Sequence, residues 1–155
     1  MEICNENDMK TIIDILEEYR AKDPNASILF DDAHPKGITY AQLDDFSGRV
    51  YGYLKEHNIG KEDFVLIGLP RGVLPIIAMI GVWKAGAAWV LVEDTYAPDR
   101  IDFISKDCGC RIGIDASNWD VIMQCDYVSG HIVPDEHDAA YAVYTSGTTG
   151  NPKGV

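Results

Sequence analysis

Basic residues are scarce in this sequence. Its 155 residues include 13 lysines and arginines against 25 aspartates and glutamates, which gives a formal net charge of −12. Nucleic acids and anionic membranes bind to broad positive surfaces, and a chain with this balance of charge is poorly suited to present one. We therefore expect no nucleic-acid partner and no membrane partner.

The sequence also lacks long apolar runs. The longest uncharged run in its apolar centre is Gly72–Trp83, between Arg71 and Lys84, whereas a membrane-spanning helix needs about 20 apolar residues. The residues after Met1 do not form the basic and apolar leader of a secreted protein. These absences predict a cytoplasmic protein in which Gly72–Trp83 belongs to a buried element.

Cysteines are few and poorly spaced for a metal site. They lie at positions 4, 108, 110 and 125, and they contain no Cys-x-x-Cys pair of the kind that binds zinc. A zinc site that uses His131 or His137 is the less favoured alternative, because no cluster of ligands surrounds either residue in the sequence. We expect both histidines to be solvated loop side chains. The sequence predicts free thiols, no metal site and no assignable catalytic residue.

What the sequence does contain is a glycine- and hydroxyl-rich stretch, Thr145-Ser146-Gly147-Thr148-Thr149-Gly150-Asn151-Pro152-Lys153-Gly154. It follows the apolar run 139–144, which we expect to form a strand buried on both faces. Glycine lets a backbone approach a ligand closely, and successive free N–H groups form a concave anion site. The four hydroxyls add neutral donors and Lys153 adds a positive charge. These features predict a phosphate-binding loop.

Two other interpretations compete with a phosphate-binding loop. A polar turn between strands is the simpler one, because glycine commonly marks turns. A Walker A loop fails on spacing, because that motif places Gly-Lys-Ser/Thr at the start of a helix. Here Pro152 precedes Lys153 and Gly154 follows it, and proline disfavours helix at the preceding Asn151.

The rest of the chain alternates strand and helix patterns. Apolar runs typical of buried strands lie near 64–69, 88–92 and 111–114. Helical patterns lie near 40–57, 73–85 and 98–107. This order predicts an α/β fold with a mainly parallel sheet flanked by helices.

Local signals refine this expectation. Thr39 and Gln42 form a capping box for the helix at 40–57. An earlier helix, capped by Asn7 or Asp8, is expected to run to about Ala21. The spacing Gly68-x-x-x-Gly72 lacks the dinucleotide-binding fingerprint, which argues against a Rossmann dehydrogenase.

Several segments resemble the adenylate-forming (AMP-binding) superfamily. Thr145–Gly154 resembles its phosphate-loop signature over ten contiguous residues. Trp83–Val90 is similar to its Leu-Lys-Ala-Gly-x-Ala-Tyr-Val segment, and Asp94–Ile101 to its Pro-x-Tyr-Pro-x-x-Arg-Leu segment, with Asp94 and Ala97 in place of the prolines. Ile38–Leu43 resembles the Leu-Thr-Tyr-x-Glu-Leu motif of amino-acid adenylation domains. The chain is most similar to the N-terminal part of such a domain from a non-ribosomal peptide synthetase.

The resemblance implies an enzyme that uses ATP and Mg²⁺ to activate a carboxylate, with an amino acid favoured. In this family the carboxylate attacks the α-phosphate of ATP, pyrophosphate leaves, and a carrier-protein or CoA thiol takes the acyl group. The nucleotide phosphates would then be bound by Thr145, Ser146, Gly147, Thr148, Thr149, Gly150 and Lys153. Lys153 and the backbone donors would stabilise the charge that develops on pyrophosphate.

The family's adenine-, ribose- and acyl-binding segments have no counterpart in residues 1–155. The resemblance therefore implies an N-terminal fragment of an adenylation domain that ends just after the phosphate loop, 145–154, and that does not complete the reaction alone. The alternatives are a fragment of an acyl- or aryl-CoA ligase, and a non-catalytic binding or assembly module that keeps the fold. A downstream reading frame with the remaining motifs would favour the enzyme, and a natural stop codon after Val155 would favour the module.

Two further expectations follow for such a fragment. The phosphate loop is expected to be poorly ordered or displaced, because it lacks the elements that would pack against it. The apolar run 139–144 would lack its cover, which predicts exposed apolar surface and truncation-induced self-association.

Overall fold

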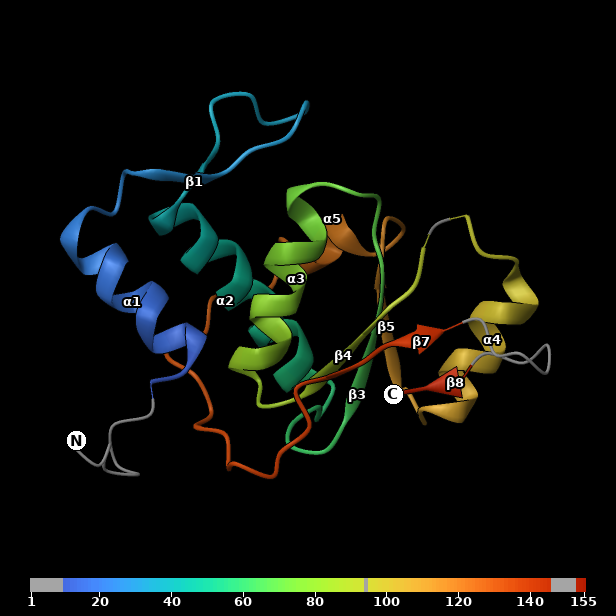
Figure 1. Cartoon of the computed structure of the whole chain (residues 1–155). Helices are drawn as coiled ribbons and strands as arrows, with labels where there is room; N and C mark the ends of the chain where they lie inside the picture. The colour runs from blue at the N-terminus through green and yellow to red at the C-terminus, as the bar shows by residue number, and fades with distance from the viewer. Residues whose placement is uncertain (1–9, 94, 146–152) are drawn as a thin grey trace, which may run out of the picture.

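A parallel β-sheet lies at the centre of the fold (Figure 1). The computed structural model describes residues 10–93, 95–145 and 153–155. Within these residues the sheet has the strand order β5-β3-β4-β6, and every neighbouring pair is parallel. Its strands are β3 (Phe64–Gly68), β4 (Ala88–Leu91), β5 (Ile112–Asp115) and β6 (Tyr141–Ala142). The predicted parallel sheet is therefore confirmed.

Helices cover both faces of this sheet (Figure 1). One face carries α2 (Tyr40–Glu56), α3 (Val73–Lys84) and the short α5 (Trp119–Ile122), and the other carries α4 (Pro98–Asp107). Successive strand residues point to opposite faces. Val65 and Ile67 of β3 therefore join the core on the α2 and α3 side, whereas Phe64 and Leu66 pack on the α4 side. The bounds of β3, β4, β5, α2, α3 and α4 lie within one residue of those predicted.

The N-terminal elements pack on the outer side of α2 and α3. They are α1 (Ile12–Lys22) and a small antiparallel pair, β1 (Ser27–Leu29) with β2 (Ile38–Thr39). The expected cap at Asn7 or Asp8 is wrong, because Thr11 is the N-cap and α1 begins at Ile12. The Thr11 hydroxyl accepts from the Asp14 N–H, and the Asp14 carboxylate accepts from the Thr11 N–H. This capping box satisfies two free backbone N–H groups at the start of α1. At the start of α2, the predicted capping box of Thr39 and Gln42 is confirmed.

The helix α3 is apolar around its whole circumference because it is covered on both sides. Ala78 and Val82 contribute to the core with the sheet and α2, whereas Ile77 and Ile80 pack in the cluster that includes Ile13 of α1. The predicted buried helix is thus confirmed. Among the described residues, no helix combines the length and the apolar character needed to cross a membrane.

Residues 139–144 do not form one strand buried on both faces, so that expectation is wrong. Tyr141 and Ala142 pair with β4, whereas Tyr144 pairs with a later segment, and the chain changes partner at Val143. Tyr141 and Val143 are 54% and 45% exposed. Within the described residues β6 lies at the edge of the sheet, where a strand has a neighbour on one side only. Self-association through this apolar edge stays a prediction.

Candidate functional site

The described part of the glycine-rich stretch forms a short hairpin. Strand β7 (Tyr144–Thr145) pairs antiparallel with β8 (Lys153–Gly154), so that Thr145 lies opposite Lys153. Val143 and Val155 extend the pairing with two backbone hydrogen bonds of 3.0 and 2.9 Å. The hairpin follows the carboxyl end of β6 and lies beside α4 (Figure 1). It therefore brings together the two ends of the predicted phosphate loop.

The two faces of the hairpin differ in burial. The Tyr144 side chain is 9% exposed and packs in the core on the α4 side of the sheet. Thr145 and Lys153 are both exposed. Residues directly opposite in an antiparallel pair project to the same face, with Cβ atoms about 4.5–5.5 Å apart. The structure thus places one neutral donor and one positive charge side by side on the solvent face.

The remaining predicted site residues are Ser146, Gly147, Thr148, Thr149 and Gly150. They lie outside the described residues, so their part in a phosphate site stays a prediction. The expectation that the loop is poorly ordered or displaced also concerns residues outside that range.

Two cavities open at the carboxyl ends of the parallel strands, an edge where open α/β sheets commonly bind ligands. Their volumes are about 110 and 290 Å³, and Glu93 lines both. Asp115 lines the smaller one, and Arg71 in the larger one is paired with Glu93 at 3.2 Å. These carboxylates disfavour a phosphate, so the hairpin is the better phosphate site. Sequence reasoning did not single out these cavities.

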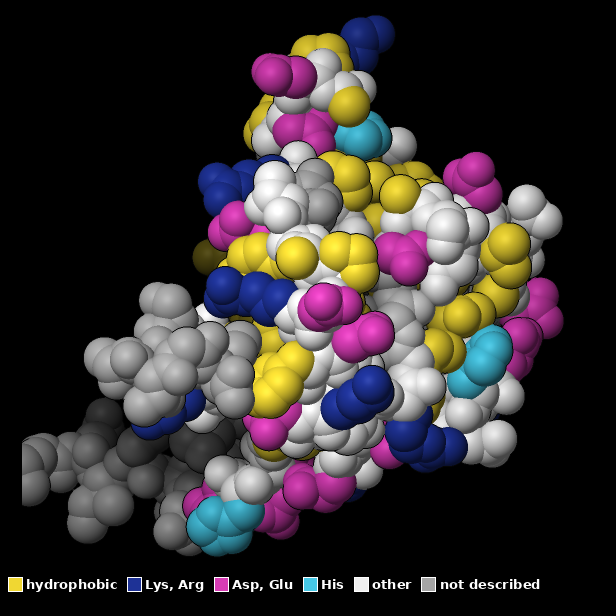
Figure 2. Space-filling model, turned by 90° about the vertical axis from the view of Figure 1, so that its right-hand side faces the viewer, with side chains coloured by type: hydrophobic (Ala, Val, Ile, Leu, Met, Phe, Trp, Pro, Cys, Tyr) yellow, Lys and Arg dark blue, Asp and Glu magenta, His cyan; other side chains and the backbone are white. Residues whose placement is uncertain are grey.

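The face that carries α4 has no dominant charge among the described residues. Figure 2 shows acidic and basic side chains interspersed with apolar ones over this face. A ligand phosphate would therefore be recognised by a local set of donors, and long-range attraction by a positive surface would contribute little.

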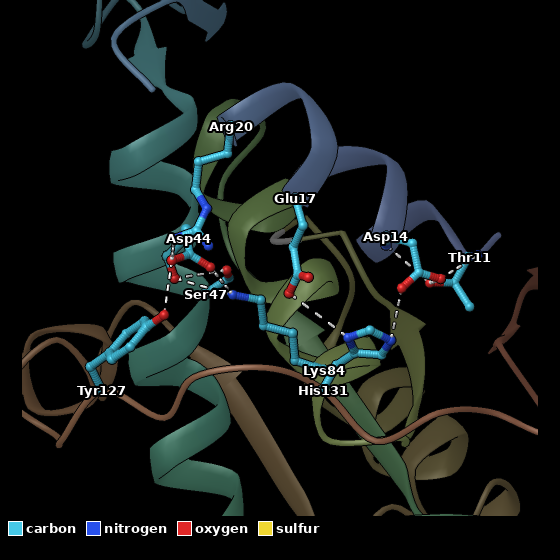
Figure 3. Close-up of polar contacts among 9 residues, drawn as sticks. All are labelled: Thr11, Asp14, Glu17, Arg20, Asp44, Ser47, Lys84, Tyr127 and His131. Atoms are coloured by element: carbon cyan, nitrogen blue, oxygen red, sulfur yellow. Dashed lines mark hydrogen bonds and ion pairs between the residues drawn. The ribbon is translucent and has the colours of Figure 1, made fainter. Parts of the chain in front are cut away.

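A charged cluster with a buried lysine at its centre lies between α1, α2 and α3 (Figure 3). The Lys84 ammonium of α3 donates to Asp44 Oδ1 at 2.7 Å, and the Lys84 side chain is 3% exposed. Asp44 of α2 also accepts from Arg20 at 2.5 Å and from the Tyr127 hydroxyl at 2.9 Å. Burial raises the pKa of the Asp44 carboxyl, but the hydrogen bond and charge of Lys84, with Tyr127 and Arg20, outweigh burial and lower that pKa overall. Sequence reasoning missed this cluster.

His131 is not the solvated loop side chain that was expected. Its side chain is 10% exposed, and its ring nitrogens lie 3.5 Å from Asp14 and 3.9 Å from Glu17, both on α1 (Figure 3). The loop is held there because the Ile132 N–H donates to the Lys84 carbonyl at 2.9 Å. His137 is 87% exposed. No group of three or more histidine, cysteine or acidic side chains among the described residues could hold a metal ion.

The described cysteines, Cys108, Cys110 and Cys125, are free thiols. Burial, with a contribution from the neighbouring Cys108, raises the pKa of the Cys110 thiol to about 12. A thiol with this pKa remains protonated at neutral pH and is a weak nucleophile. The geometry therefore gives no support to Cys110 as a nucleophile.

Comparison with known proteins identifies the family. The profile of the AMP-binding enzyme family matches residues 16–131, which is more than half of the chain. The chain belongs to the AMP-binding enzyme family. The match ends before residue 145. The resemblance of Thr145–Gly154 to the phosphate-loop signature is therefore a separate observation, and it agrees with the family assignment.

Curated AMP-binding relatives are large synthetases. The chain is 37% identical over 126 residues to the probable non-canonical nonribosomal peptide synthetase CymA of Salinispora arenicola, a match that covers 76% of this chain and 2% of that protein. It is 30% identical over 168 residues to nonribosomal peptide synthetase 5 of Gibberella zeae, covering 92% of this chain and 2% of that protein. The chain therefore spans only a small part of the relatives that it matches.

Solved structures share the fold of this chain. The N-terminal subdomain of Klebsiella oxytoca NpsA, in complex with 3-hydroxyanthranilyl-AMSN, superimposes with a TM-score of 0.80 at 27% identity. The match covers 95% of this chain and 40% of the NpsA chain.

The Lys-Ala-Gly segment of this AMP-binding chain has a structural role. Lys84 ends α3 and donates to Asp44, and Gly86, at φ +72°, turns the chain into β4. Glycine adopts this left-handed conformation without the steric cost that other residues incur. The segment therefore joins a buried ion pair to a tight turn, and neither residue belongs to the hairpin.

Proposed function

We propose that this chain is the N-terminal part of an AMP-forming enzyme that uses ATP and Mg²⁺ to activate a carboxylate as an acyl-adenylate. The observation that carries the proposal is the β7–β8 hairpin. It closes a glycine- and hydroxyl-rich segment and holds Thr145 beside Lys153 on an exposed face, in a chain of the AMP-binding family. The proposed phosphate-binding residues are Thr145, Ser146, Gly147, Thr148, Thr149, Gly150 and Lys153.

In this proposal the loop orients the phosphates and stabilises their charge. The hydroxyls and free N–H groups hold the β- and γ-phosphates, which positions the α-phosphate for attack. Lys153 stabilises the charge that develops on the departing pyrophosphate. Residues 145–154 contain no aspartate or glutamate, so they suit an anion and not a bare cation. Mg²⁺ would enter with the nucleotide and offset the charge of its phosphates.

We favour an amino acid as the carboxylate and a carrier-protein thiol as the acceptor. The support is that the curated relatives are nonribosomal peptide synthetases. An aryl carboxylate, with CoA as a further acceptor, is the second candidate, because the NpsA neighbour carries a 3-hydroxyanthranilyl group. We place the reaction in the cytoplasm, where ATP is abundant.

Carboxylate-dependent exchange of labelled pyrophosphate into ATP tests this proposal. The assay uses the complete protein that contains this chain, with one pool of amino acids and one pool of aryl and acyl carboxylates. We expect exchange with the amino-acid pool that requires Mg²⁺ and disappears without carboxylate. Exchange with the second pool alone would favour the ligase alternative. A folded protein that exchanges with neither pool would contradict the proposal and favour a non-catalytic module.

A further inference from the structure

The hairpin is attached to the body of the fold through the Tyr144 side chain. Tyr144 lies in one buried cluster with Val90, Val92 and Ile104, and its hydroxyl donates to Asp107 Oδ2 at 2.6 Å. The Cys108 sulfur lies 3.1 Å from the same hydroxyl. Burial and the Asp107 carboxylate raise the pKa of the Tyr144 hydroxyl above its ordinary value, so the hydroxyl remains a donor at neutral pH. Tyr144 directly precedes Thr145, the first proposed phosphate-binding residue.

The position of Asp107 points to a role beyond helix stability. Asp107 is the last residue of α4. The carboxyl end of a helix carries partial negative charge, so a carboxylate there is unfavourable and a basic residue such as Lys106 is the expected type. The hydrogen bond from Tyr144 gives this carboxylate a partner that the helix itself does not provide.

The second strand of the hairpin, β8, packs closely on the Tyr144 ring at Gly154. A Cβ atom on Gly154 would lie 3.0 Å from the Tyr144 ring and 3.1 Å from its hydroxyl oxygen. Gly154 therefore allows β8 to lie directly on the ring. A slip of one residue between the strands would exchange the buried and exposed faces. The contacts of Tyr144 thus determine which residues face solvent.

We propose that Tyr144 and Asp107 are positioning residues of the phosphate loop. Their hydrogen bond attaches β7 to α4 and so fixes which face of β7 is buried. In this arrangement Thr145 and Lys153 lie together on the exposed face. Through this attachment α4 becomes part of the support of the loop. The consequence for phosphate binding rests on the proposed function, whereas the attachment itself is a property of the chain alone.

Three substitutions separate this role from ordinary packing. Tyr144→Phe keeps the ring in the core and removes only the hydroxyl. Asp107→Ala removes the acceptor, whereas Asp107→Asn keeps an oxygen that can accept the same hydrogen bond. Asp102→Ala is the matched control, because Asp102 is an exposed carboxylate on the same helix.

Amide hydrogen exchange of the 155-residue chain, read by NMR, gives the first test. The Val143 and Val155 amides bond across the hairpin, and amides of β3 serve as the internal reference. Loss of one hydrogen bond changes an opening equilibrium by roughly two- to tenfold. We therefore expect exchange at the hairpin to be faster by roughly this factor in Tyr144→Phe and Asp107→Ala, with β3 unchanged. Asp107→Asn should restore slow exchange. Equal exchange in all variants, or equal acceleration in β3, would overturn the proposal.

Titration of the same variants with Mg·ATP gives the second test. Tyr144→Phe and Asp107→Ala should bind roughly two- to tenfold more weakly than the unsubstituted chain, and Asp107→Asn and Asp102→Ala should bind as it does. Unchanged affinity in every variant would show that the hydrogen bond does not position the loop for phosphate. If the unsubstituted chain shows no response to Mg·ATP while hairpin exchange accelerates as expected, the attachment stands and phosphate binding by the loop of this chain fails.

Discussion

Replacing Asp44 with alanine is expected to lower the free energy of unfolding by about 3–5 kcal/mol, the cost of removing one partner from a buried ion pair. Lys84 is 3% exposed, and without the Asp44 carboxylate its ammonium keeps a single acceptor among the described residues, the Asp44 carbonyl oxygen at 3.2 Å. Arg20 and Tyr127 also lose their acceptor. Urea unfolding followed by circular dichroism measures the change.

Two variants control this prediction. Asp45→Ala removes the neighbouring carboxylate on α2, which is 43% exposed and pairs with Arg49, so it should cost no more than about 1 kcal/mol. Lys84→Met should cost less than Asp44→Ala, because Asp44 keeps Arg20 and Tyr127 as partners. An Asp44→Ala chain as stable as the Asp45→Ala chain would contradict the account of the cluster.

The cluster also gives stability a defined pH dependence. The pKa of the Asp44 carboxyl is lower in the folded chain than its ordinary 3.8. A group of this kind contributes stability that is present above pH 3.8 and is lost as the pH falls through the folded pKa. The stability difference between the unsubstituted chain and Asp44→Asn should therefore shrink below pH 3.8.

Replacing Gly81 with valine is expected to destabilise the fold by about 1–3 kcal/mol, the usual cost of overpacking. Valine has a slightly better helix propensity than glycine, which offsets only a small part of this cost. Gly81 lies where α3 meets α2. A Cβ atom there would lie 2.4 Å from Val50 Cβ and 2.9 Å from the Ser47 carbonyl oxygen. The Ser47 oxygen belongs to the backbone of α2 and the Val50 Cβ is bonded to it, so neither atom can move aside without the helix. The helices α2 and α3 would therefore have to separate. The shift of the thermal midpoint measures the effect.

Ile76→Val is the matched control for this contact. It places the same side chain in the same helix at a position that is 39% exposed, where a change within about 0.5 kcal/mol is expected. Equal midpoints for Gly81→Val and Ile76→Val would show that the helices do not touch at Gly81.

The sheet and its helices could be predicted because their signals are local. Phe64–Gly68 and Ala88–Leu91 are apolar at consecutive positions, as in strands covered on both faces. The apolar run before Lys84 likewise indicates a covered helix. The run 139–144 gave the same signal, yet Tyr141 and Val143 are exposed. Composition alone does not reveal that a strand lies at the edge of a sheet.

The contacts that organise the site and its support were less accessible to sequence reasoning. Asp44 and Lys84 are separated by 40 positions in the sequence, and Tyr144 and Asp107 by 37. No local pattern encodes such distances. A lone lysine at the end of an apolar helix was a usable signal, because a buried ammonium requires a partner. The glycine-rich stretch was recognisable from its residue types, and the structure adds the hairpin that unites Thr145 with Lys153.

Titration of the 155-residue chain with Mg·ATP, read by NMR at each backbone amide, tests most directly whether the loop at 145–154 binds phosphate. We expect the largest shifts at amides of this loop. Lys153→Met should weaken binding roughly tenfold or more, because it removes a charge-assisted hydrogen bond. Lys36→Met, which removes an exposed lysine between β1 and β2, should leave the affinity unchanged. Shifts confined to other parts of the chain, or equal affinity in both variants, would contradict the account.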